Sequence, residues 1–128
     1  MPRKTITPAS LDLQPRPTNP YSPGAMAGGL VFTAGQVAWD ETGNVTAVGD
    51  VRGQTVQTLK NVVAVLTEAG ASVDDVVKCN VYLKDMADFQ IMNEEFAKVF
   101  PKDPPARTTV QAHLAEPEML VEIEAVAV

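Results

Sequence analysis

The sequence contains a single cysteine, Cys79, and a single histidine, His113, among its 128 residues. One cysteine cannot close an internal disulfide, so the chain gives no sign of an oxidising compartment. The alternating pattern around Cys79 predicts a small core hydrophobe rather than a nucleophile. One cysteine and one histidine are too few to form a zinc-binding cluster. His113 is predicted to lie in a strand with no serine beside it, so a catalytic serine triad is not expected either. We therefore expect no metal.

Long basic runs, long apolar runs and glycine-rich phosphate loops are also missing. Ten lysine and arginine residues stand against sixteen acidic ones, which gives a net charge of −6. Because phosphate binding needs a basic face, this balance argues against nucleic acid as a partner. No stretch approaches the roughly 20 apolar residues of a membrane span, and no apolar region follows the basic N-terminus. We expect a cytoplasmic protein that binds neither nucleic acid nor membrane.

The first part of the chain contains a proline-rich segment followed by a predicted strand. Six prolines lie within residues 2–23, which predicts extended chain with at most a short strand at 5–7. A strand over residues 29–39 is interrupted at Gly35, where a bulge or a close backbone approach is expected. A turn follows at residues 40–44. We interpret residues 1–128 as one domain.

Two amphipathic helices alternate with strands in the remainder. Asp50 predicts the N-cap of a helix that Gly70 closes, and apolar residues recur along it at steps of three and four. Residues 77–84 alternate as a strand whose inward side chains are Val77, Cys79, Val81 and Leu83. A second helix is predicted over residues 86–99. This order predicts an α+β fold, with a mixed sheet and two helices on one face.

The C-terminal segments 104–113 and 118–125 carry the candidate site. Alternation along a strand places Arg107 and Thr109 on one face of the first segment, and Glu122 and Glu124 on one face of the second. An antiparallel hairpin with its turn at residues 114–117 would set Thr109 opposite Glu122 and Arg107 opposite Glu124. Two interpretations stay open. The arginine either forms a solvated salt bridge or, presented rigidly by Pro104-Pro105, captures a carboxylate ligand bidentately.

The sheet has a second face that two helices cannot cover. Several apolar residues add bulk to that face, namely Leu30, Phe32, Trp39, Leu120, Val126 and Val128. We predict that this face is buried by oligomerisation, which would put Arg107 and Glu122 at or near a subunit interface.

Short motifs over nearly the whole length resemble the RidA (YjgF/UK114) family of reactive-intermediate deaminases. In order, they are Pro20-Tyr21-Ser22, residues 31–36, residues 57–62, Val77-Lys78 with residues 81–85, residues 89–93, Pro105-Ala106-Arg107, and residues 121–125. Each block alone is a weak signal. Their order and spacing together are specific.

The resemblance implies a chorismate-mutase-like (YjgF) α+β fold, assembled as a homotrimer with three intersubunit clefts. It also implies cofactor-free hydrolysis of 2-imino acids such as 2-iminobutanoate and 2-iminopropanoate, or of their enamine tautomers, to 2-oxo acids and ammonia. Carried over by position, Arg107 would hold the substrate carboxylate, and Glu122 would position and activate the attacking water. Tyr21, Gly35 and Asn93 would complete the cleft.

Two further candidate contacts depart from the family pattern. Ala34 stands where serine is common, and the missing hydroxyl removes a hydrogen bond worth roughly 0.5–1.5 kcal/mol. Thr109 stands where cysteine or serine is common, and its extra methyl group narrows the cleft. Two alternatives therefore stay open: an aminomuconate-type deaminase with a larger substrate, or a non-catalytic trimeric carboxylate-binding or chaperone-like protein. Ribonuclease activity, also ascribed to this family, is disfavoured by the acidic charge.

Overall fold

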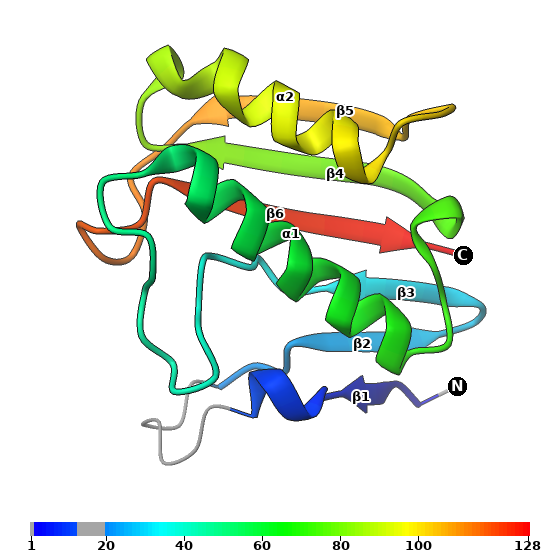
Figure 1. The fold of residues 1–128 in the computed structure, drawn as a ribbon. Helices are drawn as coiled ribbons and strands as arrows, with labels where there is room; N and C mark the ends of the chain where they lie inside the picture. The colour runs from blue at the N-terminus through cyan, green and yellow to red at the C-terminus, as the bar shows by residue number, and fades with distance from the viewer. Residues whose placement is uncertain (1, 13–19) are drawn as a thin grey trace.

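The computed structural model describes residues 2–12 and 20–128 as a six-stranded sheet with two α-helices (Figure 1). The strands are β1 (Lys4–Ile6), β2 (Gly24–Ala27), β3 (Leu30–Thr33), β4 (Val76–Leu83), β5 (Ala106–Gln111) and β6 (Val121–Ala127), and the helices are α1 (Val51–Glu68) and α2 (Phe89–Val99). Three 3₁₀ helices, η1 (Ala9–Leu11), η2 (Val73–Asp75) and η3 (Met86–Asp88), complete the described elements. The extended chain expected at residues 13–19 lies outside the described residues.

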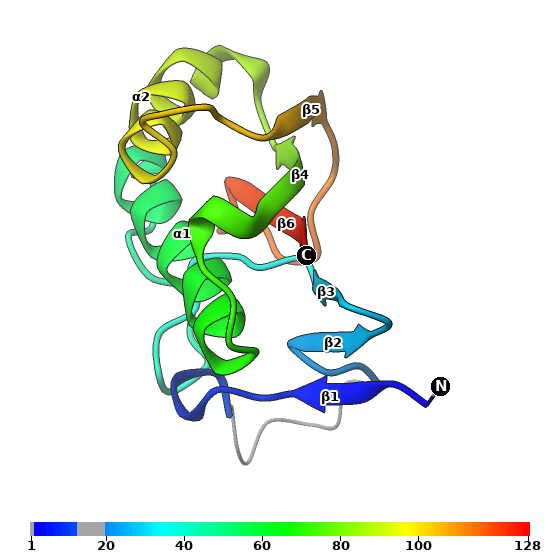
Figure 2. The same ribbon diagram turned by 90° about the vertical axis from the view of Figure 1, so that its right-hand side faces the viewer.

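The strands follow the order β1-β2-β3-β6-β4-β5, and only β4 and β5 run parallel within this described sheet. Both helices lie on the same face of the sheet (Figure 2). They pack against β4 and β6 over the main core, which includes Leu59, Leu66, Val81, Phe96 and Ile123. The predicted mixed α+β sheet with two helices on one face is confirmed.

The predicted C-terminal hairpin is wrong. β4 lies between β5 and β6, so the two C-terminal strands do not pair. Strand β6 has the more continuous apolar face, with Val121, Ile123, Ala125 and Ala127 all buried, and it takes a central position between β3 and β4. The half-polar strand β5 goes to the sheet edge as the parallel partner of β4, with α2 as the crossover. Alternation fixes the faces of a strand but not its neighbour.

Helix α1 begins and ends where the sequence predicts. The Asp50 side chain accepts a hydrogen bond from Gly53 N at 3.1 Å, and Gly70 adopts φ +81° after the last turn. The side of α1 that faces the sheet is not purely apolar, because Gln54 and Asn61 are buried on it. Both of these amides bond to loop backbone near the site.

Strand β4 contains a bulge between Val76 and Lys78. Val76 is therefore buried and Val77 is half exposed, which corrects the expected inward position of Val77. The remaining inward residues, Cys79, Val81 and Leu83, are fully buried as predicted. Burial raises the pKa of the Cys79 thiol to about 11.

The second face of the sheet carries exposed apolar side chains. Leu30, Phe32 and Val110 are each at least 40% exposed, and no helix of the described chain covers them. Trp39 was expected on this face but is buried with Val37 and Met119 in a separate cluster. The chain leaves the strand at Gly35, so strand alternation no longer fixes where Trp39 lies. Among the described helices, none is long and apolar enough to cross a membrane.

Candidate functional site

The first half of the site forms where β3 breaks. Ala34 N donates to Pro23 O at 2.8 Å, and Gln36 then exchanges two backbone hydrogen bonds with Ile123 of β6, at 2.8 and 2.9 Å. Between them, the backbone of Gly35 lies directly against the Glu122 carboxyl group, so a Cβ atom at position 35 would overlap that group. The predicted close approach at Gly35 is confirmed. Its physical cause is the neighbouring side chain of β6.

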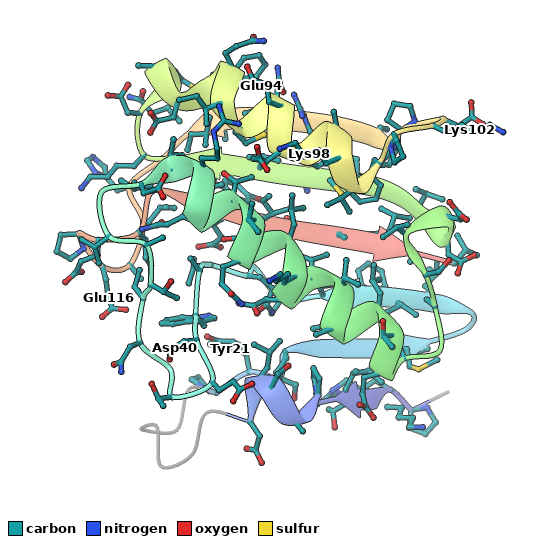
Figure 3. The ribbon with its side chains drawn as sticks, in the orientation of Figure 1. Tyr21, Asp40, Glu94, Lys98, Lys102 and Glu116 are labelled. Carbon is teal, nitrogen blue, oxygen red and sulfur yellow. The ribbon has the colours of Figure 1, made fainter. Side chains whose placement is uncertain are left out.

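A cavity of about 480 Å³ opens at this point. It brings together four of the residues expected from the sequence, Tyr21, Ala34, Gly35 and Glu122. Glu116 also lines it, and Figure 3 shows Tyr21 and Glu116 toward the end of the sheet where the loops before α1 and before β6 lie. Tyr21 is 56% exposed, so its ring borders the cavity rather than filling a core position.

Glu122 is a carboxyl group in an unfavourable environment for charge. Burial is the main cause that raises its pKa above the usual glutamate value, and the nearby carboxylate of Glu124 adds to the effect. Glu124 itself accepts hydrogen bonds from Tyr82 Oη at 2.9 Å and Asn80 Nδ2 at 3.0 Å. Glu122 therefore holds a proton more tightly than an exposed glutamate, which suits a group that accepts and returns a proton.

The second half of the site surrounds Arg107. Its guanidinium donates to Asn93 Oδ1 at 2.5 Å and lies over the Phe96 ring, 4.8 Å from the ring centre. Burial lowers its pKa, but an arginine still stays charged at neutral pH. A cavity of about 470 Å³ adjoins it, bordered by Pro104 and Pro105. No ion pair joins Arg107 to a carboxylate in the described chain, so the surface salt-bridge interpretation is wrong.

Thr109 follows Arg107 on the same face of β5. Its hydroxyl is buried and has no hydrogen-bond partner among the described residues. A buried hydroxyl left unpaired costs about 1–3 kcal/mol, so this position is not optimised for the stability of the fold.

Within this chain, the two halves do not meet. Arg107 is in register with Cys79 and Glu122 is in register with Tyr82, three residues further along the same strand. Because alternate residues point to opposite faces, Arg107 lies on the helix side of the sheet and Glu122 on the open side. The expected proximity of arginine, hydroxyl and carboxylate through a hairpin is therefore wrong.

Some residues of the site were not anticipated from the sequence. Val37, Trp39 and Met119 form an apolar wall of the Glu122 cavity, and Phe96 stacks on Arg107. Phe96 lies in the helix predicted over residues 86–99, but the helical pattern does not indicate a cation–π contact. Val37 and Met119 lie in irregular chain, where no period signals their direction. The structure shows no group of three potential metal ligands within the described chain.

The fold and these two half-sites define a small α+β protein that presents an arginine and a partly buried carboxyl group on opposite faces of one mixed sheet. The profile of the family described as Endoribonuclease L-PSP matches residues 12–128. A RutC family protein of Pyrococcus horikoshii is 44% identical over 113 residues, which cover 88% of this chain and 90% of the relative.

Solved structures agree with these sequence relatives. The crystal structure of the E. coli YjgF gene product has a TM-score of 0.85 and 35% identity, and the match covers 98% of both chains. That of E. coli TdcF with bound serine gives the same TM-score, identity and coverage. The chain belongs to the RidA (YjgF/UK114) family, and it has the YjgF fold. The resemblance found in the sequence is thereby confirmed.

Proposed function

We propose that the protein hydrolyses reactive 2-imino acids, such as 2-iminobutanoate and 2-iminopropanoate, to 2-oxo acids and ammonia without a cofactor. The observation that carries this proposal is Arg107, a charged guanidinium at a cavity that is paired with an amide and an aromatic ring instead of a carboxylate. Such an arginine is available for an α-carboxylate ligand. Serine bound to E. coli TdcF is a small carboxylate of the same kind.

In the proposed reaction, the substrate carboxylate pairs with Arg107, and Asn93 fixes the direction of the guanidinium. Glu122 accepts a proton from a water molecule while the oxygen of that water forms a bond to the imine carbon. That proton passes to the nitrogen, which gives a carbinolamine. Glu122 then transfers the remaining hydroxyl proton to the nitrogen, the C–N bond breaks, and ammonia leaves as the C=O bond forms. An imine carbon is already electrophilic, so orientation and proton transfer account for most of the catalysis required.

We further propose that the protein is a homotrimer in which Arg107 of one protomer faces Glu122 of the next. Opposite placement of the two halves within a protomer supports this arrangement, because neither cavity alone contains both groups. The exposed Leu30, Phe32 and Val110 side chains on the open face supply apolar surface for the contact. Thr109 and Tyr21 then line the cleft from either side.

Replacement of Arg107 by alanine tests this function. We expect kcat/KM for freshly generated 2-iminobutanoate to fall on the order of 100-fold, since hydrogen bonds to charged groups contribute about 1.5–3 kcal/mol. The measurement is the rate of 2-oxobutanoate release. Lys102→Ala is the matched control, because Lys102 is an exposed cation on the loop after α2 (Figure 3). Equal rates for the Arg107 variant and the wild type would rule out the carboxylate clamp.

Glu122→Gln separates catalysis from simple carboxylate binding. In a deaminase, this variant keeps affinity for a 2-oxo acid, which needs Arg107, and loses turnover, which needs the proton acceptor. A non-catalytic carboxylate-binding or chaperone-like protein would show no imine hydrolysis above the uncatalysed rate in the wild type itself.

A further inference from the structure

One face of helix α2 surrounds the guanidinium of Arg107. Asn93 Oδ1 accepts a hydrogen bond from it at 2.5 Å, and Met92 Sδ lies 3.8 Å from Arg107 Nη1. The centres of the Phe96 and Phe89 rings lie 4.8 and 5.6 Å from the Arg107 Cζ atom. Because these four neighbours all belong to α2, the direction of the guanidinium depends on where this helix lies and how it is rotated.

A second face of α2 is joined to α1 by an arginine. Arg52, in the first turn of α1, donates from Nη1 to Glu95 Oε2 at 2.6 Å and from Nη2 to Glu94 Oε1 at 2.9 Å. The Glu95 side chain is only 5% exposed, and its second cation is Lys98 of α2 itself, at 2.9 Å (Figure 3). Every ion pair in the described part of the chain belongs to this cluster. A nearly buried carboxylate needs such partners, so these bonds determine which polar groups of the two helices meet.

The forked contact of Arg52 resists rotation of α2. Successive residues of an α-helix are turned by about 100° around its axis, so bonds to both Glu94 and Glu95 hold the helix from two directions. The apolar packing of α2 on the core is not directional in this way. A rotation of about 10° would displace atoms at the outer radius of the helix, about 5–6 Å from its axis, by about 1 Å. A shift of this size is enough to separate Asn93 Oδ1 from the guanidinium of Arg107.

We propose that Arg52 is a positioning residue for Arg107: its bonds to two neighbouring glutamates fix the rotation of α2, and α2 holds the guanidinium ready for the substrate carboxylate. The effect passes through the helix, because Arg52 bonds to one face of α2 and Arg107 to another. This inference rests on the proposed role of Arg107 as the carboxylate clamp.

The first test is the dissociation constant of 2-oxobutanoate, measured by calorimetry on the wild type and on Arg52→Ala. We expect binding to weaken at least about fivefold, since displacing the clamp by about 1 Å is costly. The kcat for 2-iminobutanoate should change less than about twofold, because a contact made equally in the ground and transition states affects KM alone. Lys98→Ala is the matched control: it removes the other cation of Glu95 but leaves the contact between the helices, and should not change the affinity. Equal losses in both variants would overturn the inference.

The NMR signal of the Arg107 Hε proton gives a second readout that needs neither ligand nor turnover. It is assigned by its absence in Arg107→Ala, and the two aromatic rings beside the guanidinium displace it from the position of an exposed arginine. In Arg52→Ala it should move toward the exposed position, and in Lys98→Ala it should stay. An unchanged signal overturns the inference, and so does an unchanged dissociation constant. A wild type that binds 2-oxobutanoate but hydrolyses no imine would reject the deaminase function and leave these two measurements to decide the role of Arg52.

Two further variants separate positioning from a general loss of stability. Gly70→Ala strains the residue after α1, where φ is +81°, and should leave the affinity and the Arg107 signal unchanged. The same changes in Gly70→Ala as in Arg52→Ala would show that instability alone causes them. Arg52→Lys can reach only one of the two carboxylates. If Arg52→Ala does not fold, this variant should give a smaller change in the same direction, and no change in it would overturn the inference.

Discussion

The surroundings of Arg107 and Glu122 determine whether their charges are available to a ligand. The arginine is stacked on an aromatic ring and bonded to a neutral amide, so its charge is not neutralised inside the protomer. The glutamate is partly buried next to a second glutamate, so its proton is held more tightly than usual. Opposite charges that would cancel as a salt bridge are thus kept apart and available for a ligand.

Glu124→Gln should change the pH dependence of the proposed activity. The Glu124 carboxylate adds to the burial that raises the pKa of Glu122. In the proposed reaction, the base form of Glu122 is the reactive one. Activity therefore rises with pH through the pKa of Glu122, and removal of the neighbouring charge should move this midpoint to lower pH. Glutamine retains an oxygen that accepts from Tyr82 and Asn80. The check is the acid limb of kcat/KM against pH, and an unchanged midpoint in the variant would contradict the assignment.

Gly35→Ala should affect activity more than stability. The new methyl group would overlap the Glu122 carboxyl group, which lies at the end of a flexible side chain and can move into the cavity. We expect at least about a tenfold loss in kcat/KM, because small displacements of a catalytic group are costly, with little change in the urea midpoint.

Gly70→Ala provides the opposite control. It introduces a side chain at φ +81°, where L residues are strained by roughly 1–2 kcal/mol, but no atom within 4 Å would contact the new Cβ. Stability should fall and activity should not. The same loss of stability in both variants, with no difference in rate, would refute a special role for Gly35.

Helix α1 acts as a support for the cavity as well as a core element. Asn61→Ala removes the donor to two loop carbonyls, Val37 O and Trp39 O, and we expect a loss of about 1–3 kcal/mol in the free energy of unfolding. Gln57→Ala is the matched control, because the Gln57 amide bonds to Asn61 itself rather than to the loop. Urea denaturation measures both. Equal losses would show that the loop contacts contribute nothing specific.

The sequence predicts both helices, strand β4 and the interruption at Gly35, because each depends on a local signal such as a cap, a period or a glycine. The strand that pairs with β5 could not be predicted, because the alternation of side chains shows which face each residue is on but not which strands are neighbours. The bulge at Val77 and the burial of Trp39 depend on backbone departures from strand geometry, which no periodicity reports. Sequence reasoning named four of the residues lining the Glu122 cavity, but it missed the apolar wall and paired Arg107 with the wrong strand.

The two half-sites lie on opposite faces of the sheet, and this leads to a prediction for assemblies that contain two different variant chains. If each cleft joins Arg107 of one protomer to Glu122 of the next, Arg107→Ala and Glu122→Gln chains can complement each other. Random cyclic trimers from equal amounts should recover about one quarter of the wild-type rate, because about three quarters are mixed and each of these contains one intact cleft of three.

The mixture is prepared by refolding the two variants together, and light scattering first establishes the number of chains in the assembly. Each variant refolded alone is the control and should remain inactive. Absence of any recovery in a mixed trimer would show that the two residues do not act across subunits.

The buried position of Cys79 gives the chain an internal reporter. It is the only cysteine, it lies at 0% exposure in the centre of β4, and its thiol pKa of about 11 keeps it protonated near neutral pH. A thiol-reactive dye can modify it only when the core around β4 opens, since both access and the thiolate form are then restored. The labelling rate of the unaltered protein therefore reports how often the central sheet opens, without any engineered probe.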